Sequence, residues 1–389
     1  MKAIFLSTFR FPNNDAGSLR YSFLSKLFSE KGYLPYFIGK GDSSLHQYSQ
    51  SNYGYYTSLK SKNNNILIRL LDTLTFFERK LIKEVKRTAH PGDIVVITCF
   101  FSKRTNMKII NFAKKNGIRV IFAIEEKYSK SELDKKNIIS RVGYSKCVSF
   151  YKNIATYNKP IIAISSYIGK FAEEANVPFV VIPFVFDETI EIPELTESHS
   201  DKIKFFYAGS PGKKDMLEEM IKGFSLLDQD ENRNAEVNIF GIDNLTARSL
   251  FPLDLLDSVQ RFVFFRGKVS REIIEKEIIK SDFSILLRRK EEEYAMAGFP
   301  TKVAESLFYG IPVITNLTSD LDLYLIDGFN SIIVEGQDAN SFSKSIKVAL
   351  SLSKDKLKSL KENSKETSLN KLTVGCFKNE FDAFFAKLF

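Results

Sequence analysis

One segment near residue 300 combines residue types that can bind an anionic ligand. Gly298 allows close approach of the backbone, and Pro300 and Thr301 begin a predicted helix whose first N–H groups and dipole favour an anion. Lys302 adds a positive charge, and Glu305 follows one turn later, where its carboxylate can accept hydrogen bonds from hydroxyl groups. A diphosphate flanked by a ribose fits this pattern. An ordinary capped helix in a βαβ unit fits it equally well.

Two common phosphate-binding motifs are absent. A P-loop would need glycine where Tyr207 stands and serine or threonine where Lys214 stands. A dinucleotide-binding turn would need a third glycine after Gly39 and Gly41, and Ser44 occupies that place. The sequence therefore favours neither a P-loop ATPase nor a dinucleotide-dependent oxidoreductase.

The signals for metal binding are weak. Two Asp-x-Asp triplets, 228–230 and 320–322, have the spacing that chelates a divalent ion beside a nucleotide diphosphate, but acidic turns in water explain them more simply. The cysteines and histidines are widely separated, at Cys99, Cys147, Cys376, His46, His90 and His199. We therefore expect no metal site, no disulfide and no cofactor, and a reducing cytoplasmic setting.

The 389-residue chain has the composition of a globular protein, with 44% hydrophobic and 26% charged residues. Its 56 Lys and Arg residues exceed its 47 Asp and Glu residues, which gives a net charge of +9. This balance suggests an anionic partner, such as nucleic acid, anionic lipid or a phosphorylated substrate, without choosing among them. The longest apolar run, 177–186, is too short to span a membrane.

Residues 76–87 alternate apolar and basic side chains. The alternating residues are Phe76, Phe77, Arg79, Lys80, Leu81, Ile82, Lys83, Val85, Lys86 and Arg87. This pattern predicts an amphipathic helix. Its apolar stripe either packs on the core and leaves a hydrated basic face, or contacts the interface of an anionic membrane.

The elements that must position these residues are short apolar runs separated by helical patterns. The runs are continuous rather than alternating, which is typical of strands buried on both faces of a parallel sheet. They lie at 2–8, 33–39, 93–99, 119–125, 161–165, 180–185, 203–209, 237–241, 262–267, 283–288, 312–316 and 331–335. Helical patterns between them include 18–31, 105–116, 214–227, 271–281 and 301–309.

Two successive β/α alternations predict an α/β protein with two doubly wound, Rossmann-like domains that face each other across a cleft. We place the first domain at 1–186 and the second at 201–373, joined by an acidic linker at 187–200. Residues 374–389 form a phenylalanine-rich stripe at helical spacing, which must bury somewhere. We predict that this last helix crosses back to the first domain. Ligands of such sheets bind beyond the carboxyl ends of the strands.

The stretch 298–314 resembles the nucleotide-sugar signature of GT-B glycosyltransferases, and specifically of retaining glycosyltransferase family 4 of the polysaccharide-assembly type. That family has a Glu-x7-Glu motif followed by Gly-x-Pro-Val-Ile. Glu305 matches its second glutamate, which binds the ribose, and 310–314 matches the following strand. Ala297 stands where the first glutamate contacts the donor sugar, which is a departure from the family.

Other segments resemble the family in the same order. The loop 207–214 resembles the first loop of the nucleotide domain, where basic residues meet the donor diphosphate, and we favour Lys214 over Lys213 there. Segments 265–269, 285–288 and 327–330 resemble later loops of that domain. In the first half, 14–20 resembles the glycine loop that faces the donor phosphate, and 124–129 resembles an acidic, aromatic segment on the acceptor side.

The resemblance implies site residues in both domains. Those implied to act in catalysis are Lys214, Glu305 and Glu126. Those implied to bind the donor are Gly17, Arg20, Gly209, Ser210, Lys213, Lys268, Arg288, Gly298, Phe299, Pro300, Thr301 and Lys302.

We expect a metal-independent glycosyltransferase of the hexosyltransferase type. It would move a sugar from a nucleotide diphosphate sugar to a glycan or lipid-linked acceptor in cell-surface polysaccharide assembly, with retention. Its place would be the cytoplasm or the inner face of the membrane, and nucleic acid would not be a partner. The alternatives are a nucleotide-sugar 2-epimerase of GT-B architecture and a degenerate, non-catalytic GT-B binding subunit, which the residue Ala297 favours.

Overall fold

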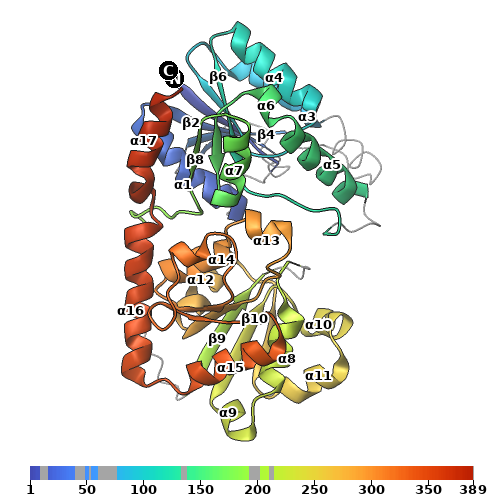
Figure 1. The fold of residues 1–389 in the computed structure, drawn as a ribbon, viewed down its shortest axis with the longest axis vertical. Helices are drawn as coiled ribbons and strands as arrows, with labels where there is room; N and C mark the ends of the chain where they lie inside the picture. Colours follow the sequence, from blue (N-terminus) through green and yellow to red (C-terminus); the bar gives the residue numbers. More distant parts are fainter. Residues whose placement is uncertain are drawn as a thin grey trace. The chain divides into compact units, whose positions relative to one another are not determined.

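The structure, a computed structural model, describes residues 1–8, 16–39, 49–51, 54–59, 77–132, 138–191, 202–209 and 214–388. The chain divides into two compact units. Unit 1 comprises Met1–Asp187, Glu292–Phe299 and Val374–Phe389, and unit 2 comprises Glu188–Glu291 and Pro300–Thr373. Both units are α/β structures on largely parallel sheets, as the sequence predicts (Figure 1).

The sheet of unit 1 has eight strands. They are β1 (Lys2–Leu6), β2 (Leu34–Gly39), β3 (Ser49–Ser51), β4 (Gly54–Ser58), β5 (Ile94–Ile97), β6 (Arg119–Ile124), β7 (Ile161–Ala163) and β8 (Phe179–Val181). Their order is β3-β4-β2-β1-β5-β6-β7-β8, and among the described strands only β3 pairs in antiparallel fashion. All four residues of β5 are buried, as expected for a strand covered on both faces.

Helices follow most of these strands along the chain. Those of unit 1 are α1 (Ala16–Glu30), α3 (Phe77–Thr88), α4 (Lys103–Lys115), α5 (Ile138–Lys152), α6 (Ile154–Tyr157), α7 (Ser166–Glu174), α13 (Glu293–Ala297) and α17 (Lys378–Ala386). Ser102 caps α4 by accepting a hydrogen bond from the Thr105 N–H, and Gly117 follows the helix with a φ of +63°. A left-handed glycine at this place is the helix stop that the sequence predicts.

The predicted amphipathic helix is α3, and its apolar stripe packs on the core. Phe77, Leu81 and Val85 are buried. Glu78 is also buried and accepts hydrogen bonds from Ser102 Oγ at 2.6 Å and Lys146 Nζ at 2.5 Å, which ties α3 to α4 and α5. Of the two expected arrangements, the structure therefore shows the core-facing helix with a hydrated basic face. Phe76 lies outside the described residues.

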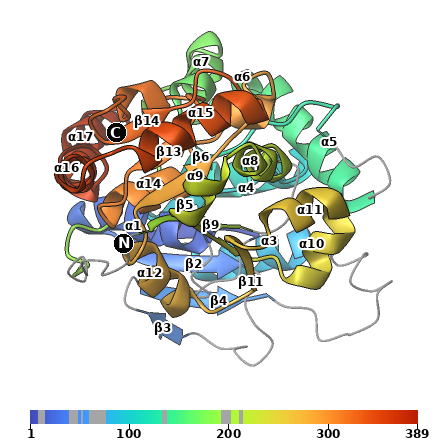
Figure 2. The same ribbon diagram turned by 90° about the horizontal axis from the view of Figure 1, so that it is seen from below.

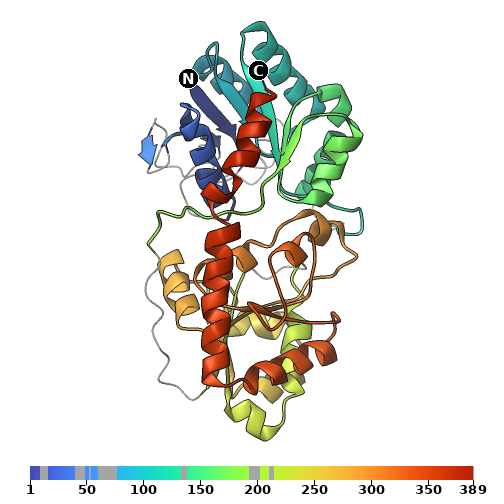
Figure 3. The ribbon, with the colours of Figure 1, turned by 60° about the vertical axis from the view of Figure 1, so that its left-hand side comes forward.

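The last helix, α17, belongs to unit 1. The ring of Phe381 lies 5.0 Å from that of Phe28 on α1, and the ring of Phe385 lies 5.8 Å from that of Tyr33. Lys31 and Asp382 form an ion pair of 2.6 Å at the edge of this contact. The predicted return of the C-terminal helix to the first domain is confirmed by this packing, which Figure 3 shows in red beside α1.

The sheet of unit 2 is entirely parallel. Its strands are β9 (Ile203–Ala208), β10 (Ala235–Phe240), β11 (Val263–Gly267), β12 (Phe283–Leu286), β13 (Val313–Thr315) and β14 (Ser331–Ile333). They lie in the order β11-β10-β9-β12-β13-β14. This is the 3-2-1-4-5-6 order of a doubly wound nucleotide-binding sheet, in which the direction of winding reverses between β9 and β12.

The helices of unit 2 cover this sheet. They are α8 (Leu217–Ser225), α9 (Gln229–Arg233), α10 (Asn244–Leu250), α11 (Leu253–Val259), α12 (Arg271–Ile279), α14 (Thr301–Phe308), α15 (Ala339–Leu350) and α16 (Lys354–Lys371). α15 lies beside α8, and the rings of Phe342 and Phe224 meet there at 5.6 Å (Figure 2). Asp228 caps α9 in a capping box, so the first Asp-x-Asp triplet is a helix start.

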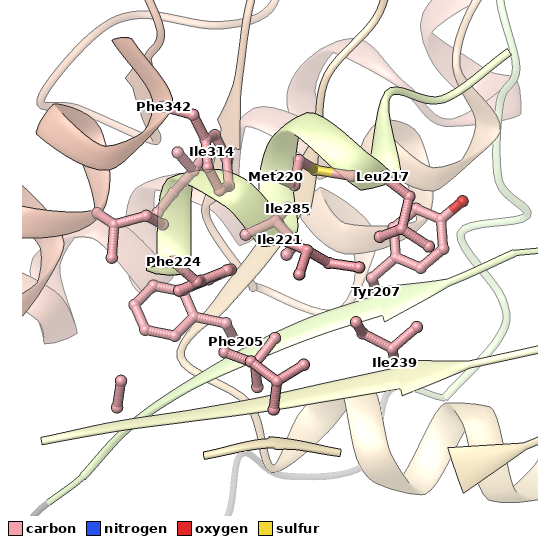
Figure 4. Packing of buried hydrophobic residues seen from close by; sticks show 14 of the residues in the cluster. Phe205, Tyr207, Leu217, Met220, Ile221, Phe224, Ile239, Ile285, Ile314 and Phe342 are labelled. Atoms are coloured by element: carbon pink, nitrogen blue, oxygen red, sulfur yellow. The ribbon is translucent and has the colours of Figure 1, made fainter. Parts of the chain in front are cut away.

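The core of unit 2 lies between α8 and the strands. Met220, Ile221 and Phe224 of α8 point toward Phe205 of β9 and Ile239 of β10, and all five are buried (Figure 4). This packing fixes β9, so that the loop after its carboxyl end starts from a rigid support.

The predicted strands are all present, and β3 and β4 are additions to them. The structure differs from the expected domain limits at two places. Asp187, expected to begin the linker, is buried in unit 1 and forms an ion pair with Lys26. The segment Glu292–Phe299, expected in the second domain, belongs to unit 1. Among the described residues, no helix is long and apolar enough to cross a membrane.

Candidate nucleotide-binding site

The reversal of winding in unit 2 places its candidate site between β9 and β12. Ligands of open α/β sheets bind at such a point, beyond the carboxyl ends of the strands. Gly209 follows β9 and Arg288 follows β12. The backbone of Arg288 is held by Asn316, which follows β13: the Arg288 N–H donates to Asn316 Oδ1 at 3.0 Å, and Asn316 Nδ2 donates to the Arg288 carbonyl at 2.7 Å.

Asp215 is the centre of this site. Its side chain is only 8% exposed and contacts two of the predicted donor-binding cations, Arg288 and Lys302. Arg288 Nε lies 3.3 Å from Asp215 Oδ1, while Lys302 Nζ pairs with Oδ2. The hydroxyl of Tyr207 donates to the same Oδ2 at 2.9 Å. One carboxylate therefore brings two cations together at the reversal point.

The charges of these groups shift one another's pKa values. Burial acts to raise the pKa of Asp215, but Lys302 and Arg288 hold it below its usual value. Burial lowers the pKa of Lys302, and the ion pair with Asp215 opposes that effect. Two cations against one carboxylate leave a net positive charge at the site. A bound anion would compensate that charge.

The start of α14 adds backbone donors beside the same lysine. Lys302 is the second residue of this helix, and no side chain caps the helix at Pro300. The first N–H groups of a helix lack intrahelical acceptors, and together with the dipole they favour an anion. Thr301, the first residue, is half-buried. The structure thus brings Pro300, Thr301 and Lys302 together with Arg288, as the sequence predicts.

Close backbone packing explains why glycines follow the strands here. A Cβ on Gly209 would come within 2.7 Å of the Tyr207 hydroxyl and 2.9 Å of Lys302 Nζ. Gly241, after β10, has a φ of +95°, and a Cβ there would meet the Gly209 carbonyl oxygen at 2.1 Å. Gly209 therefore lies in the site, and its lack of a side chain makes room for the lysine.

Glu305 lies one turn further along α14 and is 17% exposed. Its Oε1 forms an ion pair with Arg271 Nη2, from the first residue of α12. Burial raises the pKa of Glu305, and the charge of Arg271 opposes this rise. The predicted ribose-binding residue is thus a shielded carboxylate with a cation beside it.

Two of the other predicted residues of unit 2 are exposed, and two lie outside the described residues. Lys268 is exposed and directly follows Gly267, the last residue of β11. Lys214 is exposed and directly precedes Asp215. Ser210 and Lys213 lie outside the described residues.

In unit 1, the structure gives Arg20 another role than the expected one. Its side chain is 2% exposed, pairs with Glu125 at 2.6 Å and donates to the Ile182 carbonyl at 2.8 Å. A guanidinium that is buried and engaged in this way holds unit 1 together and is not presented to a phosphate. Gly17 lies half-buried in the first turn of α1. Glu126 is exposed after β6 and accepts a hydrogen bond from the Tyr128 hydroxyl.

Gly298 and Phe299 were expected beside Pro300 in one binding segment, but both belong to unit 1. Ser165 Oγ donates to the Ala297 carbonyl at 2.6 Å, and Glu293 forms an ion pair with Lys127. The side chain of Ala297 is 0% exposed. Ala297 matches the first glutamate in the motif of the family that the chain resembles, and this position is buried within unit 1.

A pocket of about 390 Å³ lies at the edge strand of unit 2, apart from these residues. It is lined by α10, α11 and β11, with Arg248, Phe264 and Arg266 among its walls. It shares no residue with the group around Asp215, so it does not identify the nucleotide site.

Sequence reasoning missed three residues of the site: Asp215, Arg271 and Asn316. A signal existed for Asp215, which follows the predicted Lys213–Lys214 pair directly. An acid next to two lysines suggests a solvated turn, and only the fold shows that it faces Arg288. Arg271 is the first residue of a predicted helix and Asn316 is the last residue of a predicted strand, but nothing in their local sequence indicates their partners.

Comparison with known proteins shows what the chain is similar to. Residues 188–367 match the family described as "Glycosyl transferases group 1". This match spans the strands and helices that carry Asp215, Arg288, Lys302 and Glu305. No curated protein sequence matches the chain.

Solved structures resemble the whole chain at low sequence identity. Alr3699/HepE from Anabaena, in complex with UDP and glucose, has a TM-score of 0.68 and 12% identity, and the match covers 100% of both chains. Sucrose-phosphate synthase from Thermosynechococcus elongatus has a TM-score of 0.71 and 12% identity, over 100% of this chain and 99% of that one. WaaG, a glycosyltransferase involved in lipopolysaccharide biosynthesis, has a TM-score of 0.66 and 13% identity, over 98% and 99%. The chain has the GT-B fold, as predicted.

Proposed function

We propose that the protein is a glycosyltransferase that uses a nucleoside diphosphate sugar as its donor. The observation that carries the proposal is the meeting of Arg288, Lys302 and the uncapped start of α14 around Asp215 at the reversal point of the unit 2 sheet. The family match of residues 188–367 supports it, because that family transfers sugars. The structural neighbour from Anabaena is described with UDP, which supports a nucleotide donor.

In the proposed reaction, the cations of the chain offset the charge that develops on the leaving diphosphate. Arg288, Lys302 and the first N–H groups of α14 are preorganised for this role, and such electrostatic stabilisation is usually the largest contribution to catalysis. Glu305 binds the ribose, and the exposed Lys214 adds charge at the diphosphate. This reading needs no metal, and it takes retention of configuration from the resemblance to glycosyltransferase family 4.

We further propose that the acceptor is a glycan or a lipid-linked glycan of cell-surface polysaccharide assembly. Likeness to WaaG, described as involved in lipopolysaccharide biosynthesis, supports an acceptor of this kind. In this proposal, the enzyme works in the cytoplasm or on the inner face of the membrane, where nucleotide sugars are made.

The decisive experiment follows the fate of the donor. Purified protein is incubated with UDP-, GDP- and ADP-sugars, with and without glycan or lipid-linked acceptors, and released nucleotide and glycosylated product are measured. A transferase forms product only with acceptor, an epimerase changes the sugar without acceptor, and a binding subunit does neither. Lys302→Met should abolish product formation, whereas Lys344→Met, at an exposed lysine of α15, should not. Binding without any turnover would overturn the proposal.

A further inference from the structure

Arg271 connects the two helices that flank the predicted nucleoside position. It is the first residue of α12, and it reaches Glu305 on α14 through Nη2. Its Nε lies 2.8 Å from Oε1 of Glu275, one turn along its own helix. The guanidinium is therefore held by an ion pair within its own helix while it forms a second ion pair with a carboxylate on α14.

This contact leaves part of Glu305 available to a ligand. A carboxylate has two oxygens and about four lone-pair positions. Arg271 engages Oε1, and within the part of the chain that the structure describes no donor contacts Oε2. With 17% of the side chain exposed, Oε2 can accept a hydrogen bond from outside the protein.

The position of Glu305 suits the sugar of a nucleotide. Residues three apart in a helix share a face, so Glu305 lies on the same face of α14 as Lys302, about one turn further in. Lys302 belongs to the cluster around Asp215 at the helix start. In a nucleoside diphosphate the ribose is joined directly to the first phosphate. A hydroxyl acceptor one turn from the phosphate-binding lysine therefore matches the ligand.

The groups around Glu305 decide whether it stays ionised. Those that act on it are Arg271 and Glu275 from α12, Lys302 from its own helix, and Tyr309, which faces Arg271. Burial and Glu275 raise the pKa of Glu305, while Arg271 and Lys302 lower it. Without Arg271, the carboxyl group would be harder to ionise and free to rotate.

We infer that Arg271 is a positioning residue for nucleoside recognition: it holds one oxygen of Glu305 so that the other accepts a hydrogen bond from the ribose. The inference rests on the proposed function, in which Glu305 faces the ribose. Arg271 itself acts through Glu305, and its loss removes the recognition of hydroxyl groups rather than the binding of the diphosphate.

The test compares ligands with and without the ribose hydroxyls. Calorimetry gives the Kd values of UDP, GDP and ADP and of their 2′,3′-dideoxy counterparts, for wild-type protein and for Glu305→Gln, Arg271→Met, Arg271→Lys and Glu272→Gln. The readout is the preference for the hydroxylated form of the tightest nucleotide. A hydrogen bond to a charged group is worth roughly 10- to 100-fold in affinity, so wild-type protein should show a preference of this size.

Glu305→Gln and Arg271→Met should both reduce this preference to within about threefold of equality. Glu272→Gln, at an exposed acid of the same helix α12, is the matched control and should keep the wild-type preference. Arg271→Lys should give an intermediate value. A wild-type preference in both Arg271 variants would overturn the inference while leaving the role of Glu305 intact. No preference in wild-type protein would remove the ribose role and the inference with it. No binding of any nucleotide would overturn the proposed function itself.

Discussion

At the scale of single residues, the site depends on one buried carboxylate between two cations. Asp215 has 8% of its side chain exposed, and it contacts Arg288, Lys302 and the Tyr207 hydroxyl. Removing one partner of a buried ion pair usually destabilises a protein more than the pair itself contributes, because the remaining charge stays buried. Asp215 is therefore the residue whose replacement should show most directly that the cluster is preorganised for an anion.

We predict that Asp215→Asn lowers the stability of the protein by about 3 kcal/mol, because it leaves Lys302 and Arg288 side by side without a countercharge. A nucleoside diphosphate should partly replace the missing charge. The rise in melting temperature on adding UDP, GDP or ADP should therefore be larger in the variant than in wild-type protein. Differential scanning fluorimetry measures both effects. Asp254→Asn, at an exposed acid of α11, is the control and should change neither.

A second residue-scale prediction concerns pH. Burial lowers the pKa of Lys302, so this lysine loses its proton at a lower pH than an exposed lysine does. The affinity for a nucleoside diphosphate should therefore fall as the pH rises through this lowered pKa. Arginine stays charged over this range. Lys302→Arg should accordingly move the decline to higher pH, and calorimetry between pH 7 and 10 checks it.

The matched control for this pH experiment is Lys344→Arg, which should keep the wild-type profile. Identical profiles for wild-type protein and Lys302→Arg would show that Lys302 does not carry the pH dependence of binding.

The residues of the site were predictable to different degrees. Lys302, Arg288 and Gly209 follow strand ends or begin a helix, and these are positions where local pattern and ligand chemistry agree. Arg20 also lies near the start of a helix that follows a strand, yet it is buried against Glu125 and a backbone carbonyl. The local sequence cannot distinguish a candidate ligand-binding residue from a buried structural residue at such a position. The difference depends on the residues that the folded sheet brings opposite it.

At the scale of elements, the strands were the elements that the sequence predicted best. Each of the predicted strands is a compact apolar run, since both faces of a parallel sheet are covered. β3 and β4 lack this signal: they are short and lie at the edge of the unit 1 sheet. α16 also lacks a clear apolar pattern. It is a helix of 18 residues whose buried face consists of Leu360 and the small polar residues Ser364, Thr367 and Ser368. This buried face is mostly polar, so the sequence shows no apolar stripe for the helix.

An element-scale prediction concerns the basic surface of α3. Because Phe77, Leu81 and Val85 are buried, α3 can meet a membrane only through its charged face. Any binding to anionic vesicles should therefore be electrostatic and lost at high salt. Replacing Lys80, Lys83, Lys86 and Arg87 with glutamine should abolish co-sedimentation with vesicles that contain phosphatidylserine.

The control for α3 neutralises Lys356, Lys358 and Lys365 of α16, which should leave sedimentation unchanged. If wild-type protein stays in the supernatant at low salt, α3 contributes to the fold alone and does not bind the vesicles. Sedimentation that persists in high salt would contradict the buried apolar stripe.

At the scale of the whole molecule, two kinds of similarity cover different parts of the chain. The family match spans 188–367, close to the extent of unit 2, while the structural likeness spans the full length at 12–13% identity. In the proposed function, a nucleotide site needs particular side chains at particular strand ends of unit 2, and the family match falls in this part of the chain. This difference explains why the predictions were more specific in the second half than in the first.

The C-terminal helix is the clearest whole-molecule feature that the sequence revealed. Residues 374–389 complete unit 1, although the whole of unit 2 lies between them and Met1–Asp187 in the sequence. Phe381, Phe384 and Phe385 are buried, and Phe381 and Phe385 meet Phe28 and Tyr33. The stability of unit 1 should therefore depend on α17, whereas that of unit 2 should not.

We predict that Phe381→Ala destabilises unit 1 by about 3–5 kcal/mol, because it opens a cavity against Phe28 in a buried aromatic cluster. Deletion of residues 374–389 should have a larger effect. Hydrogen exchange resolved by mass spectrometry should show faster exchange in α1 and β2 and unchanged protection in β9 and β10. Lys387→Ala, at an exposed residue just beyond the helix, is the control and should leave both units unchanged. Equal loss of protection in the two units would mean that they unfold as one cooperative body, and a deletion variant with wild-type exchange would show that α17 contributes nothing to unit 1.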